Sequence, residues 1–277
     1  MDFLMRDDAP LSEQEWQAID DTVRKVARAN LVGRRFIRLF GPLGSGVQAV
    51  WVDRLQGVTE GAVDVYGEES GQEVVPTSRQ IIPLNLLYKD FCLFWRDVAS
   101  ARALSAPVDT APVGAAVAML ARSEDRLIFY GAKDQRGLMN IDDHLQVSKA
   151  DGWSEPGSAL ATAVEARKAL VDHGAMGPYA LVLSPDLYAR LLRVLGQLGQ
   201  LELSLVQQVA DAGVFQTPVL AKDDGVLVSC GPDVLDLAVA DDMQVAYLGP
   251  TNMNHCFRVF ESVALRIRRP EGICVLT

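Results

Sequence analysis

The stretch RVFESVALRIR, residues 258–268, decides the fold class of this chain. Its apolar and polar side chains alternate, with Val259, Val263, Leu265 and Ile267 on one side and Arg258, Ser262, Arg266 and Arg268 on the other. This alternation predicts a long strand with one buried face. Shorter apolar runs at 226–228, 235–240 and 244–248 predict further strands, and Asp223-Asp224-Gly225 predicts a hairpin turn.

Helical patterns surround this set of strands. A capping-box pattern at Ser12–Glu15 opens a helix that runs to about Asn30. An Ala-, Met- and Leu-rich stretch from Asp109 to Gly131 predicts a long spine helix, because Gly131 is a good C-terminal stop. A further helix is predicted over 155–173, before a short buried strand at 179–183. The chain is therefore predicted to be α+β, with both ends contributing to one domain around a middle α/β part.

Residues 47–84 are predicted to form an extended arm. Alternation begins at Val47, glycines at 57, 61 and 71 predict turns, and a second extended run covers 73–83. Five acidic residues and no basic residue lie between Glu60 and Glu73. A hairpin with so few apolar residues is poorly suited to packing on its own core. We therefore expect it to lie on another subunit.

Composition excludes several classes of protein. The 277 residues are 49% hydrophobic and 22% charged, which is typical of a globular chain and excludes a disordered one. A net charge of −10 argues against a general nucleic-acid binder. The mean hydropathy of +0.12 is high for so acidic a chain. We expect apolar surface to be buried beyond the chain's own core, at a subunit interface.

Localisation follows from the same inventory. The longest apolar runs, at 110–121 and 174–185, are shorter than the ~20 residues that a membrane helix needs. The N-terminal residues carry acids where a signal peptide carries bases, so a cytoplasmic protein is predicted. The four cysteines, Cys92, Cys230, Cys256 and Cys274, form no CxxC pair and are predicted to be reduced core or interface thiols.

Catalytic motifs are missing from the sequence. The three histidines lack metal-ligand spacing, so no metal site is expected. The glycine-rich stretch 41–46 lacks the order of a phosphate-binding loop. Ser184 is not in a nucleophile motif, and Glu124 and Asp125 diverge on a helix. The sequence predicts no catalytic residue and no enzyme.

Charge is segregated near the N-terminus. Residues 1–21 hold seven acids and one arginine, whereas residues 22–38 hold six bases and no acid. This partly matches the dipole of the predicted helix. A solvated polar face and a surface for a carboxylate-bearing partner are the two interpretations.

Strings of residues along the whole chain resemble the encapsulin (linocin-like) shell proteins, whose fold is that of tailed-phage major capsid proteins. The matching strings are LVGRR (31–35) with GPLG (41–44), YKDF (88–91) with WRD (95–97), ED (124–125) with IFYG (128–131), GPYALVLSP (177–185), AYLG (246–249), MNH (253–255) and LRI (265–267). Each string is weak alone, but their order and spacing together are specific.

The resemblance implies a family 1, or type 1, encapsulin nanocompartment. Such subunits self-assemble in the cytoplasm into icosahedral cages around cargo enzymes that carry a short C-terminal targeting peptide. The cargo is commonly a ferritin-like iron-storage oxidase or a dye-decolorising peroxidase, so iron would be bound only through the cargo. The resemblance divides the chain into 1–46, the N-terminal helix and part of the peripheral domain; 47–84, the extended arm; 85–131, peripheral domain with the spine helix; 132–222, the axial domain; and 223–277, peripheral-domain strands.

The resemblance also implies functional residues. Arg34 matches a residue of the family's cargo-peptide groove, and Arg38 stands where relatives usually have Asp. Leu31, Ile37, Leu235 and Leu237 are apolar candidates for that groove or ordinary core residues. Gly196, Gln197, Leu198, Gly199 and Gln200 match the border of the five-fold pore. Some relatives hold a flavin near an aromatic residue such as Trp95, for which interface packing is the alternative; no cofactor is required.

Two other functions stay open at the level of sequence. One is a free α+β enzyme or ligand-binding protein with a site near Tyr179–Ser184. The other is a phage major capsid protein, which would share the fold but package DNA. The shell prediction involves no nucleic acid and no membrane, only copies of the chain and its cargo.

Overall fold

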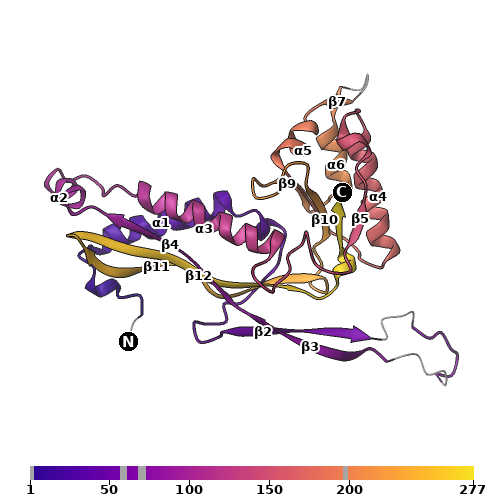
Figure 1. The fold of residues 1–277 in the computed structure, drawn as a ribbon, viewed down its shortest axis with the longest axis horizontal. Coiled ribbons are helices and arrows are strands. Elements are labelled where there is room, and N and C mark those ends of the chain that lie inside the picture. The colour runs from indigo at the N-terminus through magenta and orange to yellow at the C-terminus, as the bar shows by residue number, and fades with distance from the viewer. Residues whose placement is uncertain (1–2, 57–60, 68–72, 196–198) are drawn as a thin grey trace.

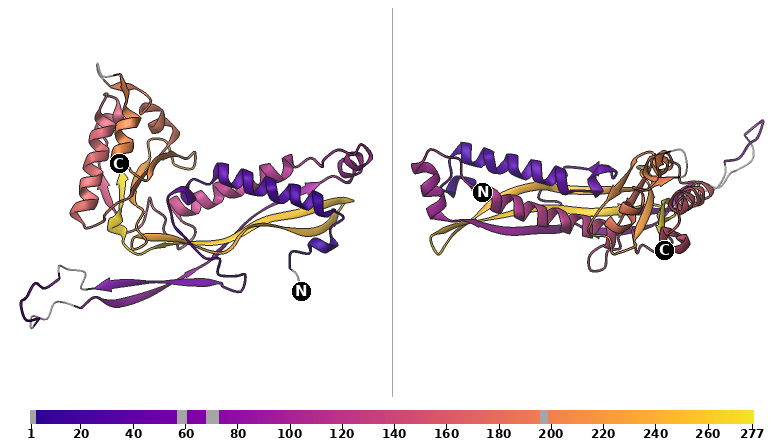
Figure 2. Two further views of the ribbon diagram at one scale, coloured as in Figure 1. Left: turned by 180° about the vertical axis from the view of Figure 1, so that it is seen from behind. Right: turned by 90° about the horizontal axis from the view of Figure 1, so that it is seen from above.

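The computed structural model describes residues 3–56, 61–67, 73–195 and 199–277. An elongated sheet carries two long helices on one face, and a hairpin arm runs out on the other side (Figure 1). A second unit with its own sheet stands at one end of the first (Figure 2). The α+β class predicted from the sequence is confirmed.

The first sheet has the strand order β1-β11-β12-β4. These strands are β1 (Leu39–Phe40), β11 (Leu235–Thr251), β12 (Asn254–Ile267) and β4 (Asn85–Leu93). Alternate residues of β12 and β4, among them Phe257 and Phe91, pack against helices α1 (Glu13–Asn30) and α3 (Ala111–Tyr130). The predicted capping box is present, because Ser12 and Glu15 bond to each other's backbone amides. A shorter helix, α2 (Trp95–Ala103), follows β4 at the far tip.

The second sheet has the order β5-β13-β10-β6-β9. Its strands are β5 (Leu145–Val147), β13 (Ile273–Leu276), β10 (Gly225–Ser229), β6 (Tyr179–Leu183) and β9 (Gly213–Gln216). Helices α4 (Ser158–Asp172), α5 (Pro185–Arg190) and α6 (Glu202–Val209) lie with it, near the short strands β7 (Val194–Leu195) and β8 (Gln200–Leu201).

Both faces of this second sheet are buried. One face joins α4 and α6 in a core that includes Leu181 and Leu227. The other face, with Val182 and Val226, shares a core with the end of α3 and the base of β11 and β12. The two units are therefore joined through packed side chains rather than through a linker.

The arm is the hairpin β2 (Ala49–Gln56) and β3 (Val75–Pro83), as the sequence predicts. Four short 3-10 segments complete the described elements: Arg6–Asp8, η2 (Gly33–Arg35), Ala150–Trp153 and Pro270–Gly272.

One expectation about the strands is wrong. Asp223-Asp224-Gly225 is not a hairpin turn, because β6 lies between β9 and β10. Within the segment 223–277, strands β10 and β13 pair inside the second sheet with β6 and β5, and its assignment as peripheral-domain strands stays a prediction. Short, fully apolar strands carry no mark of the sheet they join.

The expectation of reduced thiols is also corrected. Cys92 of β4 and Cys256 of β12 are joined by a disulfide across neighbouring strands. Cys230 and Cys274 are free. The spacing of cysteines along the sequence could not show this pairing, since 164 positions separate the two partners.

Candidate assembly surface and charge cluster

The arm has one packed face and one exposed face. Near its base, Val50, Val52 and Ile82 pack on Ala238 and Ala264 of the first sheet. The alternate residues point away, since side chains on a strand alternate between its two faces.

Apolar side chains occupy the exposed face. Trp51 and Ile81, which lie opposite each other in the hairpin, are 58% and 70% exposed. Farther out, Val63, Val65 and Tyr66 are almost fully exposed. A surface of this kind on an extended two-stranded arm is typical of a protein–protein contact.

Ion pairs join β11 and β12 beside the base of the arm. Arg266 of β12 donates to both oxygens of Asp236 at 2.7 and 2.8 Å, and Arg268 donates to the same carboxylate at 2.7 Å. The Arg266 guanidinium also lies over the Phe40 ring, 4.0 Å from its centroid. Arg266 also donates to the backbone carbonyl of Trp51 in the arm, at 3.5 Å, so the polar side of the stretch 258–268 contacts the arm rather than only facing solvent.

A buried charge cluster surrounds Arg34. This arginine in η2 donates to Glu124 of α3 at 2.6–3.0 Å, to Glu261 of β12 at 2.7 Å and to Asp242 of β11 at 2.6 Å. The Glu124 and Glu261 side chains are fully buried, whereas the Asp242 side chain is 67% exposed. The cluster joins four segments that are far apart in the sequence.

Burial and mutual repulsion disfavour the ionised form of the acids in this cluster. Burial raises the pKa of Glu261 well above its usual range, and the neighbouring Glu124 carboxylate raises it further. One Glu261 oxygen, Oε1, has no hydrogen-bond partner among the described residues. Arg34 is therefore the cation that makes this pair of buried carboxylates tolerable.

Asp125, next to the cluster, binds backbone amides instead of Arg34. Its carboxylate accepts hydrogen bonds from the backbone N–H groups of Val32 and Gly33, at 3.1 and 2.9 Å. Burial raises the pKa of Asp125 to about 7, although those two hydrogen bonds oppose the shift. Glu124 and Asp125 thus point to different partners, and neither serves as half of an acid–base pair. In the sequence, these two buried acids are marked only as two adjacent acidic residues in a predicted apolar helix.

The residues predicted for a cargo-peptide groove do not form one exposed surface. Leu31, Ile37, Leu235 and Leu237 are buried, and they belong to two different apolar cores. In this conformation the chain's own residues cover their side chains, and their part in a peptide groove stays a prediction. Their alternative interpretation as core residues is the one that the structure supports.

The two arginines predicted for the groove differ from each other. Arg34 is tied into the charge cluster, with 13% of its side chain exposed. Arg38 is exposed, and its backbone carbonyl accepts from the N–H of Leu237 at 2.9 Å. A role for Arg38 in contacting a peptide stays a prediction.

The predicted pore border lies mostly outside the described residues. This applies to Gly196, Gln197 and Leu198. Gly199 has a left-handed φ of 66°, and Gln200 begins the two-residue strand β8. The assignment of this segment to a pore stays a prediction.

Trp95 offers one aromatic face at the tip of the first sheet. It is 41% exposed, its backbone N–H donates to Asn254 at 3.3 Å, and the Arg96 guanidinium lies 5.8 Å from the centroid of its ring. The flavin near Trp95 stays a prediction.

The residues near Tyr179–Ser184 have structural tasks. The Tyr179 hydroxyl donates to the carbonyl of Ala175 at 2.8 Å, and the Ser184 side chain caps helix α5 by accepting from Leu187 N–H. All six residues of this stretch are buried, so they present no open site. Within the described ranges, no group of three or more histidine, cysteine or acidic residues is placed to hold a metal ion.

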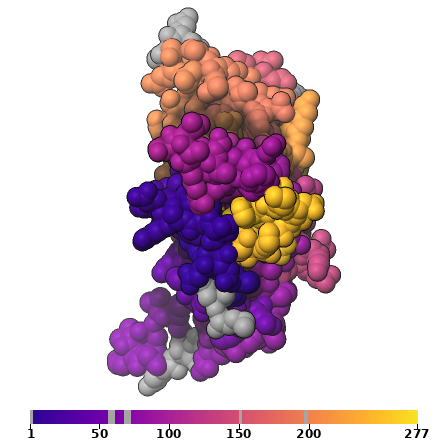
Figure 3. Space-filling model, turned by 90° about the vertical axis from the view of Figure 1, so that its left-hand side faces the viewer, coloured from indigo at the N-terminus to yellow at the C-terminus, as the bar shows by residue number. Residues whose placement is uncertain are grey.

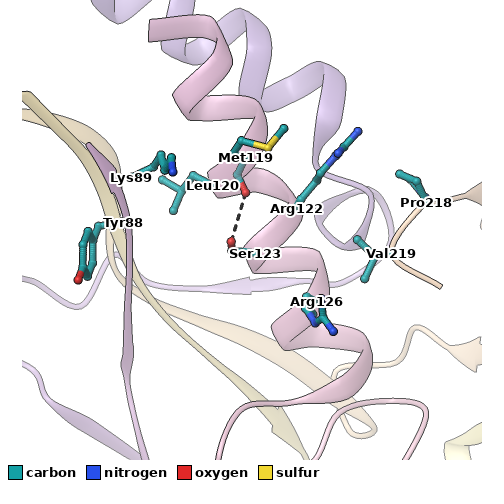
Figure 4. Close-up of a pocket in the computed structure, with 9 residues that line it drawn as sticks. All are labelled: Tyr88, Lys89, Met119, Leu120, Arg122, Ser123, Arg126, Pro218 and Val219. Carbon is teal, nitrogen blue, oxygen red and sulfur yellow. Dashed lines mark hydrogen bonds between the residues drawn. The ribbon is translucent and has the colours of Figure 1, made fainter. Parts of the chain in front are cut away.

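A shallow hollow of about 450 Å³ lies beside α3 and β4 (Figure 4). Lys89, Arg122 and Arg126 make it basic, and Ser123 donates its hydroxyl to the carbonyl of Met119 in the helix, at 3.2 Å. Its nine lining residues include no histidine, cysteine or carboxylate. The hollow suits an anionic group but has no pair of a nucleophile and a base.

The fold defines a class of protein by its likeness to solved structures. A virus-like particle from Pyrococcus furiosus matches with a TM-score of 0.78 and 19% identity, covering 96% of this chain and all of that one. The capsid of the Myoviridae phage XM1 matches with a TM-score of 0.65 and 13% identity, covering 88% of this chain and 90% of that one. The chain has the fold of capsid-type shell subunits.

Sequence comparison then gives the family. The family model described as "Encapsulating protein for peroxidase" matches residues 1–264. A type 1 encapsulin shell protein of Myxococcus xanthus is 45% identical over 99% of this chain and 96% of its own length. The chain belongs to the encapsulin shell-protein family, as the resemblance predicted. No helix among the described residues is long and apolar enough to cross a membrane.

Proposed function

We propose that this chain is the shell subunit of a type 1 encapsulin nanocompartment, and that its copies assemble into a closed icosahedral cage around a cargo enzyme. The observation that carries the proposal is the arm, whose exposed face holds Trp51 and Ile81 and has no covering surface among the described residues. Family membership supports the same conclusion.

The cargo and location belong to the same proposal. The cage would lie in the cytoplasm and recruit a protein that carries a short C-terminal targeting peptide. The family's description supports a peroxidase as cargo, and a dye-decolorising peroxidase is the kind we propose; a ferritin-like iron-storage oxidase is the other candidate. The shell would carry out no catalysis, and it would need neither nucleic acid nor membrane; any iron would be held by the cargo.

Particles isolated from the native cells test this proposal. Negative-stain images are expected to show closed shells with density inside, and mass spectrometry is expected to identify an enclosed enzyme. A phage capsid is the alternative that the fold alone would allow. Particles filled with nuclease-protected DNA and no enzyme would overturn the nanocompartment in favour of that alternative.

A further inference from the structure

The disulfide between Cys92 and Cys256 occupies a defined place in the first sheet. The two residues are directly opposite each other in the antiparallel pair β4–β12, with their Cα atoms 4.1 Å apart. Their neighbours Phe91, Leu93 and Phe257 pack toward helices α1 and α3. Because side chains alternate along a strand, the sulfur atoms lie on the face that these helices leave uncovered.

Cys92 is more exposed than the two free cysteines, of which Cys230 is half-buried and Cys274 is buried. Cys92 is exposed and Cys256 is half-buried, so a small thiol or a thiol protein can reach the bond. Burial raises the pKa of both Cys230 and Cys274 to about 12. Those two side chains remain thiols near neutral pH and do not compete in thiol–disulfide exchange.

The cross-link lies beside an exposed apolar tip. Phe94 and Trp95 follow Cys92, whereas Met253 precedes Cys256 in the turn between β11 and β12. These three side chains are 57%, 41% and 68% exposed. Figure 3 shows this end of the molecule, where the yellow turn of β11 and β12 and the purple of α2 lie together.

We propose that Cys92 and Cys256 form a redox-controlled cross-link that fixes this tip for contact with a neighbouring subunit. A cellular dithiol is the co-reactant. One of its thiolates attacks a sulfur of the pair and displaces the other cysteine as a thiolate, which takes up a proton. The second dithiol sulfur then breaks the mixed disulfide, leaving two cysteine thiols and an oxidised reductant. Two electrons and two protons pass to the pair.

The cross-link is suited to reversible control because it is accessible. Exposed disulfides are generally the labile and regulatory ones, and a reducing cytoplasm would open this bond where oxidising conditions close it. Opening frees the edge strand β4 to separate from β12 next to Trp95 and Met253. The contribution to assembly rests on the proposed function, whereas the chemistry of the pair does not.

Counting thiols tests the chemistry on the whole chain. In denaturant without reductant, we expect two reactive thiols per chain, rising to all four after dithiothreitol. Differential alkylation should assign the two new thiols to Cys92 and Cys256. Four thiols per chain that persist after treatment with oxidised glutathione would overturn the proposal.

Thermal unfolding tests the consequence. Dithiothreitol is expected to lower the melting temperature of the wild-type protein by about 5 °C or more. The variant Cys92→Ser/Cys256→Ser should lose this response, and the matched control Cys230→Ser should keep it. An equal response in the double variant would overturn the proposal. If the double variant does not fold, chemically blocked wild-type protein replaces it. Wild-type protein that has been reduced, and whose thiols have then been capped with methyl methanethiosulfonate, must melt at the lower temperature of the reduced protein.

Particle mass separates this proposal from the proposed function. Monomers with two reactive thiols would contradict the shell function and leave the cross-link standing. Closed particles whose chains have four thiols in every redox condition would support the shell function and overturn the cross-link. For the assembly role itself, reduced wild-type particles should dissociate at a lower denaturant concentration than oxidised ones, and equal values would overturn that role.

Discussion

Arg34 is the residue on which the buried cluster depends. Replacing it by methionine would remove the cation that the cluster acids share among the described residues and leave the Glu124 and Glu261 carboxyl groups buried without it. Breaking a buried ion pair in this way costs about 3–5 kcal/mol. We expect Arg34→Met to lose stability on this scale in urea unfolding.

The matched control for that variant is Arg35→Met. Arg35 is exposed, and its side chain makes one described hydrogen bond, to the carbonyl of Ala29. We expect the Arg35→Met variant to lose under about 1 kcal/mol of unfolding free energy. Equal losses at positions 34 and 35 would contradict the assignment of the cluster.

The raised pKa of Asp125 predicts that the free energy of unfolding depends on pH. Its pKa is raised to about 7 in the folded chain, so between about pH 4 and 7 the folded chain holds a proton that the unfolded chain has released. This contribution to the free energy of unfolding is complete at low pH and is lost as pH rises through 7. We expect Asp125→Asn to remove a decline of about 2–4 kcal/mol between pH 5 and 8.

The measurement for Asp125 is a difference between two proteins. Subtracting the variant's unfolding free energies from those of the wild type at each pH cancels the opposite effect of acids such as Asp90, whose pKa Arg258 lowers. A difference that stays constant from pH 5 to 8 would contradict the raised pKa.

The roles of single residues could be predicted only in part from the sequence. The strings around Arg34 and Glu124 identified the family, but their mutual contact depends on four segments meeting in space. Leu235 and Leu237 suit a groove or a core equally well in the sequence because both places take apolar side chains, and the structure adds that both side chains are buried. Cys92 and Cys256 required strand register, which no local pattern encodes.

At the scale of elements, the arm gives the sharpest prediction. Trp51 and Ile81 are opposed on its exposed face, so Trp51→Asp/Ile81→Asp would place two charges in the proposed contact. We expect this variant to fold and to remain as small species in gel filtration, because buried charges without partners oppose association. The core residues Val50 and Ile82 on the opposite face are unchanged.

The control for the arm keeps its surface apolar. Trp51→Phe/Ile81→Val should assemble as the wild type does, while far-UV circular dichroism and melting temperature report folding of both variants. Full assembly of the Asp variant would exclude this face of the arm from the subunit contact.

Elements with a strong periodic pattern were predictable. The helix after Ser12, the spine α3 and the arm hairpin agree with the structure, because caps, helical periodicity and alternation mark them locally. The destination of β10 and β13 was not predictable. Both are short and wholly buried, and a continuous apolar strand fits either sheet equally well.

At the scale of the whole molecule, the chain has more apolar surface than its own cores cover. Its mean hydropathy is +0.12 despite a net charge of −10. Part of that excess lies on the arm, at Trp51 and Ile81, and part at the tip, at Phe94 and Met253. The arm runs along one side of the elongated subunit and the tip lies at one end, and neighbouring copies in a closed shell can cover both regions (Figures 1 and 3).

The most direct test of this account is the mass of the purified chain in solution, measured by light scattering coupled to gel filtration. The account predicts a narrow population of closed particles in the megadalton range, made of the single 30.1 kDa chain. A folded 30.1 kDa monomer at micromolar concentration would contradict it.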